Sequence, residues 1–514
     1  MTRLITLFLT LVCISQPLAH AAETPPNILI MISDDQSFPH TSAYGSKMVY
    51  TPNFDRIAKE GILFNNAFCA APGCSPSRAA LLTGREIWQI EHAGTHASSF
   101  GKQYITFMDL LAEAGYHSGY IGKGWAPGDW KKGGRTQNPA GKSYRSKKND
   151  YAGGFETFLK ERPKDAPFVF WFGSRDPHRS YKKGSGRESG KTLAQAEVPS
   201  FLPDTKEIRD DLLDYAYEVD RFDRDCGKML ELLEATGDYE NTIIIVTSDN
   251  GMPFPYAKAN CNEFGIHMPL AISWKGKHTG GMTHSGLLGF IDITATIHDA
   301  TGIKAPDKFP LSGRSFLGLL TGNVDKPFRR DTVFSGRERH SSSRFNTLTY
   351  PQRCIRSDQF LFIRNFKPER WPAGPGQKLT GKPESEPGPE HGGYHDIDAC
   401  PSLTHLIENR DDQKISRFFH LAVDKRPAEQ LFDIKSDPGC INDLATDPKH
   451  AETITKLSAQ LDAYLKKTND PRVTGNGDIF ETYPRYSPIR WFPTPDWAID
   501  HPENVPKTPW LDGK

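Results

Sequence analysis

Asn27-Ile28-Leu29-Ile30-Met31-Ile32-Ser33-Asp34-Asp35 combines a continuous apolar run with two adjacent carboxylates. An apolar run without polar alternation is typical of a buried parallel strand, which helices cover on both faces of its sheet. The two carboxylates follow at the carboxyl end of that strand, where open α/β sheets bind their ligands. This stretch therefore predicts an α/β fold with a polar site at one edge of the sheet.

The alternation of apolar runs with helical periods continues along the chain. Strands are predicted over residues 118–121, 168–172, 242–247 and 270–274, and helices over residues 51–60, 107–114, 212–233 and 291–300. Strands that alternate with helices indicate a sheet with helices on both faces. Because Asp34, Asp35, Lys123, Asp176 and Asp249 all follow such strands, we expect them to share one site.

The sequence changes in character from about residue 326. Short β-like runs such as residues 360–366 are followed by a stretch rich in Pro, Gly and Glu, and a helix is predicted near residues 451–466. We therefore expect a large α/β domain with a central mixed sheet over residues 23–325. A smaller α+β subdomain with an antiparallel sheet is expected over residues 326–514, with a Pro- and Trp-rich tail that wraps the surface.

The N-terminus has the features of an export signal. Arg3 precedes an apolar run over residues 4–14, and Ala19-His20-Ala21 offers small residues for cleavage. We expect residues 1–22 to be a signal peptide and the mature protein to be exported: periplasmic, secreted or, in a eukaryote, in a lysosome-like compartment. The alternative is a retained anchor, although a membrane span needs about 20 apolar residues. No membrane span is expected.

Charge composition excludes one class of partner. Lys plus Arg and Asp plus Glu each number 63, so the formal net charge is zero. No global field favours nucleic acid, and any anion site must be a local cluster. We therefore expect no nucleic-acid partner.

Seven cysteines follow the predicted signal peptide, an odd number that leaves at least one unpaired. The other six could form disulfides or remain buried thiols. Their spacing does not decide between these alternatives.

Cys74-Ser75-Pro76-Ser77-Arg78, followed by Leu82-Thr83-Gly84-Arg85, matches the signature C-x-P-S-R…T-G-R of type I sulfatases. From about residue 26 to residue 471 the chain resembles these enzymes, which belong to the alkaline-phosphatase-like superfamily. The resemblance implies that a formylglycine-generating maturation enzyme converts Cys74 to formylglycine, whose hydrate is the nucleophile. Arg78, one helical turn later, is expected to bind the nucleophile's oxygens and Asp35. A buried structural cysteine is the alternative for Cys74.

Asp34, Asp35, Asp249 and Asn250 form an all-oxygen ligand set of the kind that Ca²⁺ and Mg²⁺ prefer. The resemblance implies that these residues, together with the modified Cys74, bind Ca²⁺, with Mg²⁺ as the alternative ion. The cation would act as a Lewis acid and as a template for the reacting groups. The competing interpretation is that these polar residues only end strands and form turns.

Three further residues are implied as catalytic. Lys123 and Lys258 match basic positions that bind sulfate in sulfatases, and His178 matches the histidine thought to protonate the leaving group. Solvated lysines and a hydrogen-bonded loop histidine are the alternatives.

One position departs from the sulfatase pattern. Most sulfatases have a histidine two residues after the lysine that corresponds to Lys123, and this chain has Trp125 there. His96 or His117 is a candidate substitute, and the sequence does not distinguish them.

Three segments are similar to the heparan N-sulfatases (N-sulfoglucosamine sulfohydrolases), which cleave a sulfamate N–S bond. They are Ser248-Asp249-Asn250-Gly251-Met252-Pro253-Phe254-Pro255, Asp176-Pro177-His178-Arg179 and Tyr350-Pro351-Gln352-Arg353. In the charged loop over residues 337–344, carboxylates and arginines are suited to sugar hydroxyls and sulfates. The expected glycan contacts are Glu338, Arg339, His340 and Arg344. A solvated loop is the alternative.

The function expected from these features is hydrolysis of a sulfate ester or sulfamate of a sulfated carbohydrate. An O-sulfatase acting on another sulfated polysaccharide is the first alternative, and a phosphate or phosphonate ester hydrolase of the same superfamily is the second. A catalytically inactive glycan-binding protein is disfavoured because the nucleophile, the arginine and the metal ligands are all present.

Overall fold

The computed structural model describes residues 24–145, 147, 150–278, 280–323, 327–376, 394–487 and 499–504. The predicted signal peptide, most of the Pro-, Gly- and Glu-rich stretch and most of the Pro- and Trp-rich end of the chain lie outside these residues. Within them, no helix is both long enough and apolar enough to cross a membrane.

In the described residues, nine strands form the central sheet in the order β4-β3-β5-β1-β6-β7-β2-β8, with β9 also paired to β2. Their bounds are β1 Asn27–Ser33, β2 Ile62–Phe68, β3 His117–Gly122, β4 Lys142–Ser143, β5 Phe168–Gly173, β6 Thr242–Ser248, β7 His267–Ser273, β8 Met282–His284 and β9 Leu288–Gly289. β1 is parallel to β5 and β6, whereas β7 is antiparallel to β6 and β2. The sheet is therefore mixed, as the sequence predicts.

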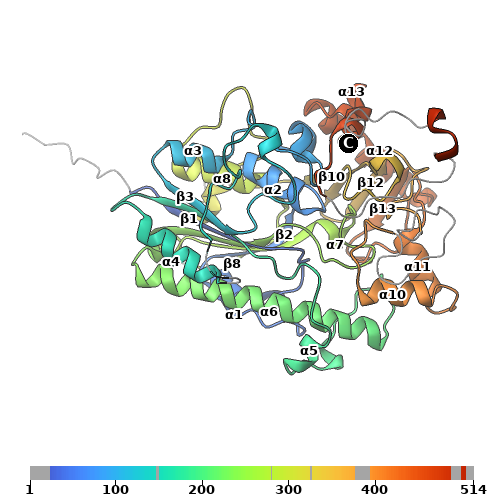
Figure 1. The fold of residues 1–514 in the computed structure, drawn as a ribbon, viewed down its shortest axis with the longest axis horizontal. Helices are drawn as coiled ribbons and strands as arrows, with labels where there is room; N and C mark the ends of the chain where they lie inside the picture. Colours follow the sequence, from blue (N-terminus) through green and yellow to red (C-terminus); the bar gives the residue numbers. More distant parts are fainter. Residues whose placement is uncertain are drawn as a thin grey trace, which may run out of the picture.

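Helices cover both faces of this sheet (Figure 1). One face packs against α1 (Pro52–Glu60), α4 (Tyr151–Glu161) and α6 (Lys206–Ala235), and the other against α2 (Cys74–Thr83), α3 (Phe107–Glu113) and α8 (Phe290–Thr301). Successive residues of β1 serve the two cores in turn: Ile28 joins the core beneath α2, and Leu29 joins the core beneath α6. Because both faces are buried, the strand has no polar alternation.

The second sheet is antiparallel, in the order β10-β11-β12-β13. Its strands are β10 Thr332–Arg337, β11 Gln352–Ser357, β12 Phe360–Asn365 and β13 Glu429–Asp433. Leu457 and Leu461 of α12 (Ala451–Lys467) pack in one core with Ile355 and Phe362 of this sheet. The remaining α-helices are α5 Ser185–Glu188, α7 Glu263–Ile266, α9 Leu317–Leu320, α10 Pro401–Glu408, α11 Ser416–Val423 and α13 Pro471–Thr474.

Two of the longer elements of the central domain, β2 and α4, were not predicted from the sequence, for local reasons. β2 contains Asn65 and Asn66 where its register with β7 shifts, and this irregularity breaks the apolar run. α4 contains Gly153 and Gly154, which lower helical propensity. The predicted helix over residues 212–233 is part of α6, which begins earlier because the Thr205 side chain caps its first turn.

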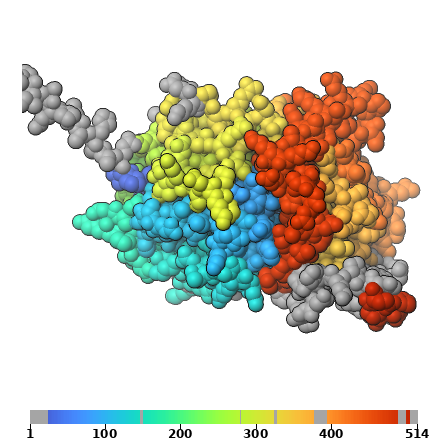
Figure 2. Space-filling view, turned by 90° about the horizontal axis from the view of Figure 1, so that it is seen from above, coloured from blue at the N-terminus to red at the C-terminus, as the bar shows by residue number. Residues whose placement is uncertain are grey.

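The C-terminal subdomain is joined to the large domain near the end of α2. Figure 2 shows the red C-terminal part of the chain lying against the blue segment. The Tyr464 hydroxyl of α12 donates to Glu86 Oε1 at 2.5 Å, and the Trp88 indole donates to Thr468 Oγ1 at 2.9 Å. Glu86 is therefore a buried carboxylate at the contact between the two parts of the chain.

Replacing Glu86 by glutamine is expected to stabilise the protein at alkaline pH. Burial raises the pKa of Glu86 to about 7, although the hydrogen bond from Tyr464 acts in the opposite direction. Because this pKa exceeds that of the unfolded chain, the protonated group contributes stability at acidic pH that is lost as the pH rises through about 7. At pH 8 the Glu86→Gln variant should gain up to about 3 kcal/mol, and the gain should shrink toward pH 5. Urea denaturation at the two pH values measures this, and an equal gain at both would contradict it.

Candidate functional site

The site lies at the carboxyl edge of the central sheet. β1, β3 and β6 end directly before Asp34, Lys123 and Asp249. α2 begins at Cys74, so the unpaired N–H groups of its first turn belong to the same region. A helix N-terminus beside strand ends is a favourable environment for an anion.

Four predicted ligands form one buried cluster. The ligand atoms of Asp34, Asp35, Cys74 and Asp249 all lie within 4.8 Å of one another. Asp35 has a left-handed backbone with φ 75°, and its N–H donates to Asp249 Oδ1 at 3.1 Å. A non-glycine residue in this conformation is strained, and such strain is concentrated at functional sites.

The cluster fits a hard divalent cation. Asn250 Nδ2 donates to Asp35 Oδ1 at 2.8 Å, whereas Asn250 Oδ1 is buried without a hydrogen-bond partner. A buried acceptor without a partner is costly, and a cation at this position would satisfy it. Carboxylate and amide oxygens are also the donors that Ca²⁺ and Mg²⁺ prefer.

Two lysines, the half-buried Lys123 and the buried Lys258, pair with the carboxylates. Lys123 Nζ lies 2.6 Å from both carboxylate oxygens of Asp34, and Lys258 Nζ donates to Asp35 at 2.6 Å and to Asp398 at 2.7 Å. Burial alone would lower the pKa of each lysine, but the carboxylates outweigh it and raise both pKa values, most strongly at Lys258. Lys258 is 4% exposed, so the alternative of a solvated lysine is wrong there.

Arg78 binds a different carboxylate from the one that the sequence predicts. Its Nε donates to Asp249 Oδ2 at 2.7 Å and its Nη1 donates to the Lys123 carbonyl at 2.7 Å, while its Nη2 lies 4.0 Å from Asp34. The prediction that Arg78 binds Asp35 is therefore wrong. Ser77 Oγ donates to the Asp249 carbonyl at 2.5 Å, so the first turn of α2 is held against the end of β6.

Charge balance at the site favours an anionic ligand once a cation is bound. Four carboxylates, those of Asp34, Asp35, Asp249 and Asp398, meet the positive charges of Arg78, Lys123 and Lys258. A divalent cation would turn this excess of one negative charge into an excess of one positive charge. Asp398 was not predicted from the sequence, because the Asp-Ile-Asp-Ala-Cys segment over residues 396–400 matches no ligand motif.

The thiol of Cys74 is unsuited to act as the nucleophile itself. Its side chain is buried, and Sγ lies 3.7 Å from Asp35 Oδ1. Burial raises the pKa of the thiol well above its ordinary value, and the nearby carboxylates reinforce this although Lys123 opposes it. Since the thiolate is the reactive form of cysteine, an unmodified Cys74 would be inert. Conversion of Cys74 to an oxygen nucleophile agrees with this environment.

His178 lies at the more open side of the cluster. Its Nε2 is 3.8 Å from Asp35 Oδ2, and its side chain is 35% exposed. Nδ1 lies 2.5 Å from the Arg179 carbonyl, which can only accept, so Nδ1 carries a proton. Nε2 is therefore the atom that can exchange a proton with a ligand.

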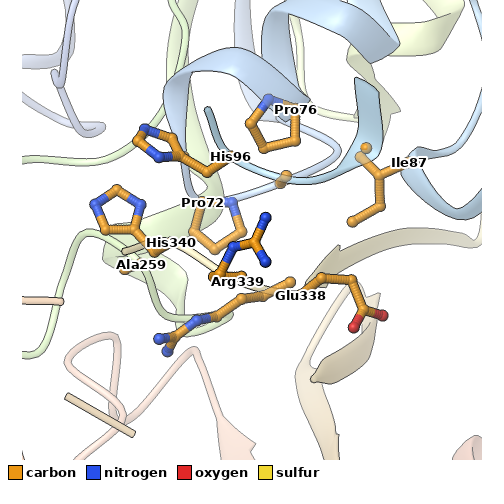
Figure 3. A pocket seen from close by; sticks show the side chains of 12 residues that line it. Pro72, Pro76, Ile87, His96, Ala259, Glu338, Arg339 and His340 are labelled. Carbon is orange, nitrogen blue, oxygen red and sulfur yellow. The ribbon is translucent and has the colours of Figure 1, made fainter. Parts of the chain in front are cut away.

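The two histidines considered as substitutes at Trp125 lie in different places. The His96 and His340 rings lie next to each other (Figure 3), tilted by 35° with their centroids 4.4 Å apart. A Cβ added to Gly73 would lie 3.9 Å from His96 Cδ2. The His117 ring is half-buried, and its centroid lies 4.4 Å from that of Phe158 in α4. His96 is therefore beside the residue that precedes Cys74, and His117 is not part of the site.

Trp125 has a structural role at the same helix. It is 1% exposed, its indole N–H donates to the Ser75 carbonyl at 3.0 Å, and its ring meets Phe100 edge-on. The Trp125 side chain therefore packs against the first turn of α2 and stabilises it through this hydrogen bond.

The four predicted substrate residues of the charged loop are all buried, so the alternative of a solvated loop is wrong. Arg339 and His340 line a small cavity of about 10 Å³ beside His96, enough for about one water molecule. The Glu338 carboxylate points away from the two histidines (Figure 3) and binds Arg353 and Arg472, each at 2.7 Å. Arg344 binds Asp396 at 2.9 Å.

The seven cysteines in the described residues are all buried free thiols. Of the two alternatives left open by their spacing, the structure has no disulfide in this part of the chain.

Comparisons with known proteins agree with this architecture. Human N-sulphoglucosamine sulphohydrolase is 28% identical over 508 residues, covering 89% of this chain and 93% of that protein. An ulvan-active sulfatase of Formosa agariphila is 24% identical, covering 87% of this chain and 75% of that protein. A structure solved with its substrate D-glucosamine-2-N,6-O-disulfate matches with a TM-score of 0.62 at 18% identity, covering 87% of this chain and 98% of the other. This likeness shows the same fold.

The sulfatase family model matches residues 26–303, which is more than half of the chain. The relatives whose similarity covers 89% and 87% of this chain, and so extends beyond the part matched by the family model, are also sulfatases. The chain therefore belongs to the sulfatase family and is a sulfuric ester hydrolase.

Proposed function

We propose that this protein releases sulfate from a sulfated carbohydrate and that its preferred substrate is an N-sulfated glucosamine. The observation that carries the chemistry is the buried cluster of Asp34, Asp35, Cys74 and Asp249, whose ligand atoms lie within 4.8 Å of one another. The N-sulfate preference is supported by the similarity to N-sulphoglucosamine sulphohydrolase over 93% of that protein. An O-sulfatase acting on another polysaccharide is the second candidate, supported by the similarity to ulvan-active sulfatases.

Two groups would complete the site. Asp34, Asp35, Asp249 and Asn250 would hold Ca²⁺ or Mg²⁺, which supplies Lewis-acid stabilisation of the sulfate charge. Formylglycine, made from Cys74 by a maturation enzyme, supplies a hydroxyl nucleophile in its hydrated form. Arg78 holds Asp249 and the first turn of α2, so it positions residue 74.

The remaining residues bind the sulfate and move protons. Lys123 and Lys258 stay charged and have N–H donors beyond those that their carboxylate partners use, so they bind sulfate oxygens. His178 donates a proton from Nε2 to the leaving nitrogen or oxygen. Glu338 and Arg344 hold the charged loop through their ion pairs, which keeps Arg339 and His340 beside His96.

We also propose that residues 23–325 form the catalytic domain of an exported enzyme. Residues 326–514 form the C-terminal subdomain, whose Asp398 and 337–344 loop complete the site. The apolar run after Arg3 and the small residues near Ala21 support export.

His96 is proposed as the base that accepts a proton from the hydroxyl at position 74. His96→Gln is expected to lower kcat by about 100-fold or more, in the range of general acid–base catalysis. The matched control is His117→Gln, which should change kcat by less than about twofold because His117 packs against Phe158 of α4, outside the site. Steady-state kinetics of the two variants, with circular dichroism to verify folding, measures the difference. Equal effects from both substitutions would refute the assignment.

Sulfate release by calcium-loaded protein, co-expressed with a formylglycine-generating enzyme, tests the proposed function. The substrates are glucosamine N-sulfate and N-sulfated disaccharides, compared with O-sulfated sugars and with phosphate esters. Release from N-sulfated sugars alone supports the N-sulfatase proposal. Release from O-sulfated sugars alone would favour the second candidate, and faster cleavage of phosphate esters would contradict both.

A further inference from the structure

A polar cavity of about 450 Å³ lies between the first turns of α6, α10 and the chain over residues 179–183. Figure 1 shows α10 beside the end of α6. The volume of the cavity falls within the range of roughly 300–1,000 Å³ that is typical of small-molecule sites. By contrast, the cavity beside His96 holds about one water molecule. The larger cavity therefore has room for a sugar ring.

Two residues of the active site lead directly into this cavity. His178 is followed by Arg179, and Asp398 is followed by Ala399, both of which line it. Arg179 Nε also donates to the Pro253 carbonyl at 2.8 Å, in the segment that carries Asn250 and Lys258. Since consecutive Cα atoms are about 3.8 Å apart, the cavity begins about one residue from the site along two separate loops.

At the base of the cavity, the charges of Arg179 and Asp211 neutralise each other. Arg179 makes a bidentate pair with Asp211 at 2.7 and 2.8 Å, and both side chains are buried. Asp211 also accepts from Ser402 Oγ of α10 at 2.5 Å. Because the Arg179 charge is used within this network, it offers little attraction to an added anion.

Two buried polar atoms in the lining have no hydrogen-bond partner. They are His405 Nε2 and Asp210 Oδ1. The Asn409 amide lies 3.4 Å from His405 Nδ1, which therefore accepts, so Nε2 carries the proton and is a donor. The Asp210 carboxylate is half-buried: its Oδ2 accepts from Lys206 at 2.5 Å, and its Oδ1 is an acceptor that lies 3.6 Å from Arg187. A buried donor and a buried acceptor in one cavity match hydroxyl groups, which can both donate and accept.

The charge of the lining indicates which sugar fits. Five carboxylate side chains and three cationic side chains line the cavity. This excess of negative charge disfavours a sulfate group and is compatible with an unsulfated ring, whose hydroxyls bind carboxylates well.

We propose that this cavity is a second glycan subsite, which binds an unsulfated sugar next to the sulfated one. The inference rests on the proposed function, because that function places the sulfated sugar at the Cys74 cluster. Asp210 and His405 bind hydroxyls of the neighbouring ring and take no part in the chemistry.

The test compares kcat/KM for a sulfated monosaccharide with that for its disaccharide with an unsulfated neighbour. The unmodified protein should prefer the disaccharide by about tenfold, the effect of one or two hydrogen bonds. Asp210→Asn and His405→Gln should each reduce this preference to within about twofold, with the monosaccharide rate unchanged. Glu231→Gln on α6 and His420→Gln on α11, both exposed and outside the lining, are matched controls that should keep it. A disaccharide whose neighbouring ring is sulfated should show no preference.

Direct binding separates this proposal from the proposed function. Titration of the unsulfated disaccharide into the full-length protein, followed by calorimetry, should show binding that Asp210→Asn weakens about tenfold. Such binding without sulfate release from any substrate would retain the subsite and reject the function. Sulfate release without a disaccharide preference, or a preference that both variants keep, would overturn the subsite.

Discussion

Replacing Cys74 by alanine is expected to lower sulfate release by about 10⁴-fold or more, the usual scale for loss of a covalent nucleophile. The fold should be unaffected, because the polar contact of Cys74 Sγ with Asp35 Oδ1 is a weak one at 3.7 Å. Affinity for a divalent cation should fall only modestly, since Asp34, Asp35 and Asp249 remain. Sulfate assays and calcium titration of the same preparation measure the two effects separately.

Cys69→Ala is the matched control for this prediction. Cys69 is also buried, but its Sγ donates to the Ala71 carbonyl at 3.1 Å and is not one of the clustered ligand atoms. Cys69→Ala should change kcat by less than about threefold, because the substitution removes only a weak S–H donor and little packing. Retained activity in Cys74→Ala would contradict the nucleophile assignment, whatever Cys69→Ala does.

Replacing Arg353 by methionine is expected to produce the largest loss of stability. Arg353 is buried and binds Asp470 at 2.6 Å and Glu338 at 2.7 Å, and its guanidinium also lies 4.9 Å from the Trp88 ring. Burial opposes its charge, but the two carboxylates outweigh this and raise its pKa. Removing one partner from a buried ion pair leaves an uncompensated charge and costs about 3–5 kcal/mol. Chemical denaturation should detect a corresponding shift.

A second substitution tests the cause of that loss. In the Arg353→Met, Asp470→Asn double variant the uncompensated charge at residue 470 is gone, while the asparagine can still cap α13. Part of the lost stability should therefore return. A single variant that loses less than about 1 kcal/mol, or a double variant that is less stable than the single one, would contradict the buried-charge explanation.

Arg353 also shows how a motif can carry structural information. It belongs to one of the segments that resemble heparan N-sulfatases, and its side chain links β11 to α13 and to the 337–344 loop. The buried ion pairs therefore give Arg353 of this segment a structural role, and a link between the segment and substrate choice stays a prediction.

The sequence by itself determined the layered α/β architecture and the edge at which the site lies. Strands such as β1 are buried on both faces, so they must be continuously apolar, and this pattern is local. Asp34, Lys123 and Asp249 follow such strands directly. Parallel strands end at one edge of a sheet, so local position was enough to predict that these side chains meet.

Only the tertiary structure decided which side chains pair within the site. Lys258 and Asp398 are 140 residues apart, and Arg78 and Asp249 are 171 residues apart. His96 and His117 look equivalent in sequence, yet His96 lies beside Gly73 and His117 packs against Phe158 of α4. Partner choice depends on the approach of distant segments, which leaves no local pattern. The polar cavity beside α10 has the same origin, because its lining comes from three segments that meet only after folding.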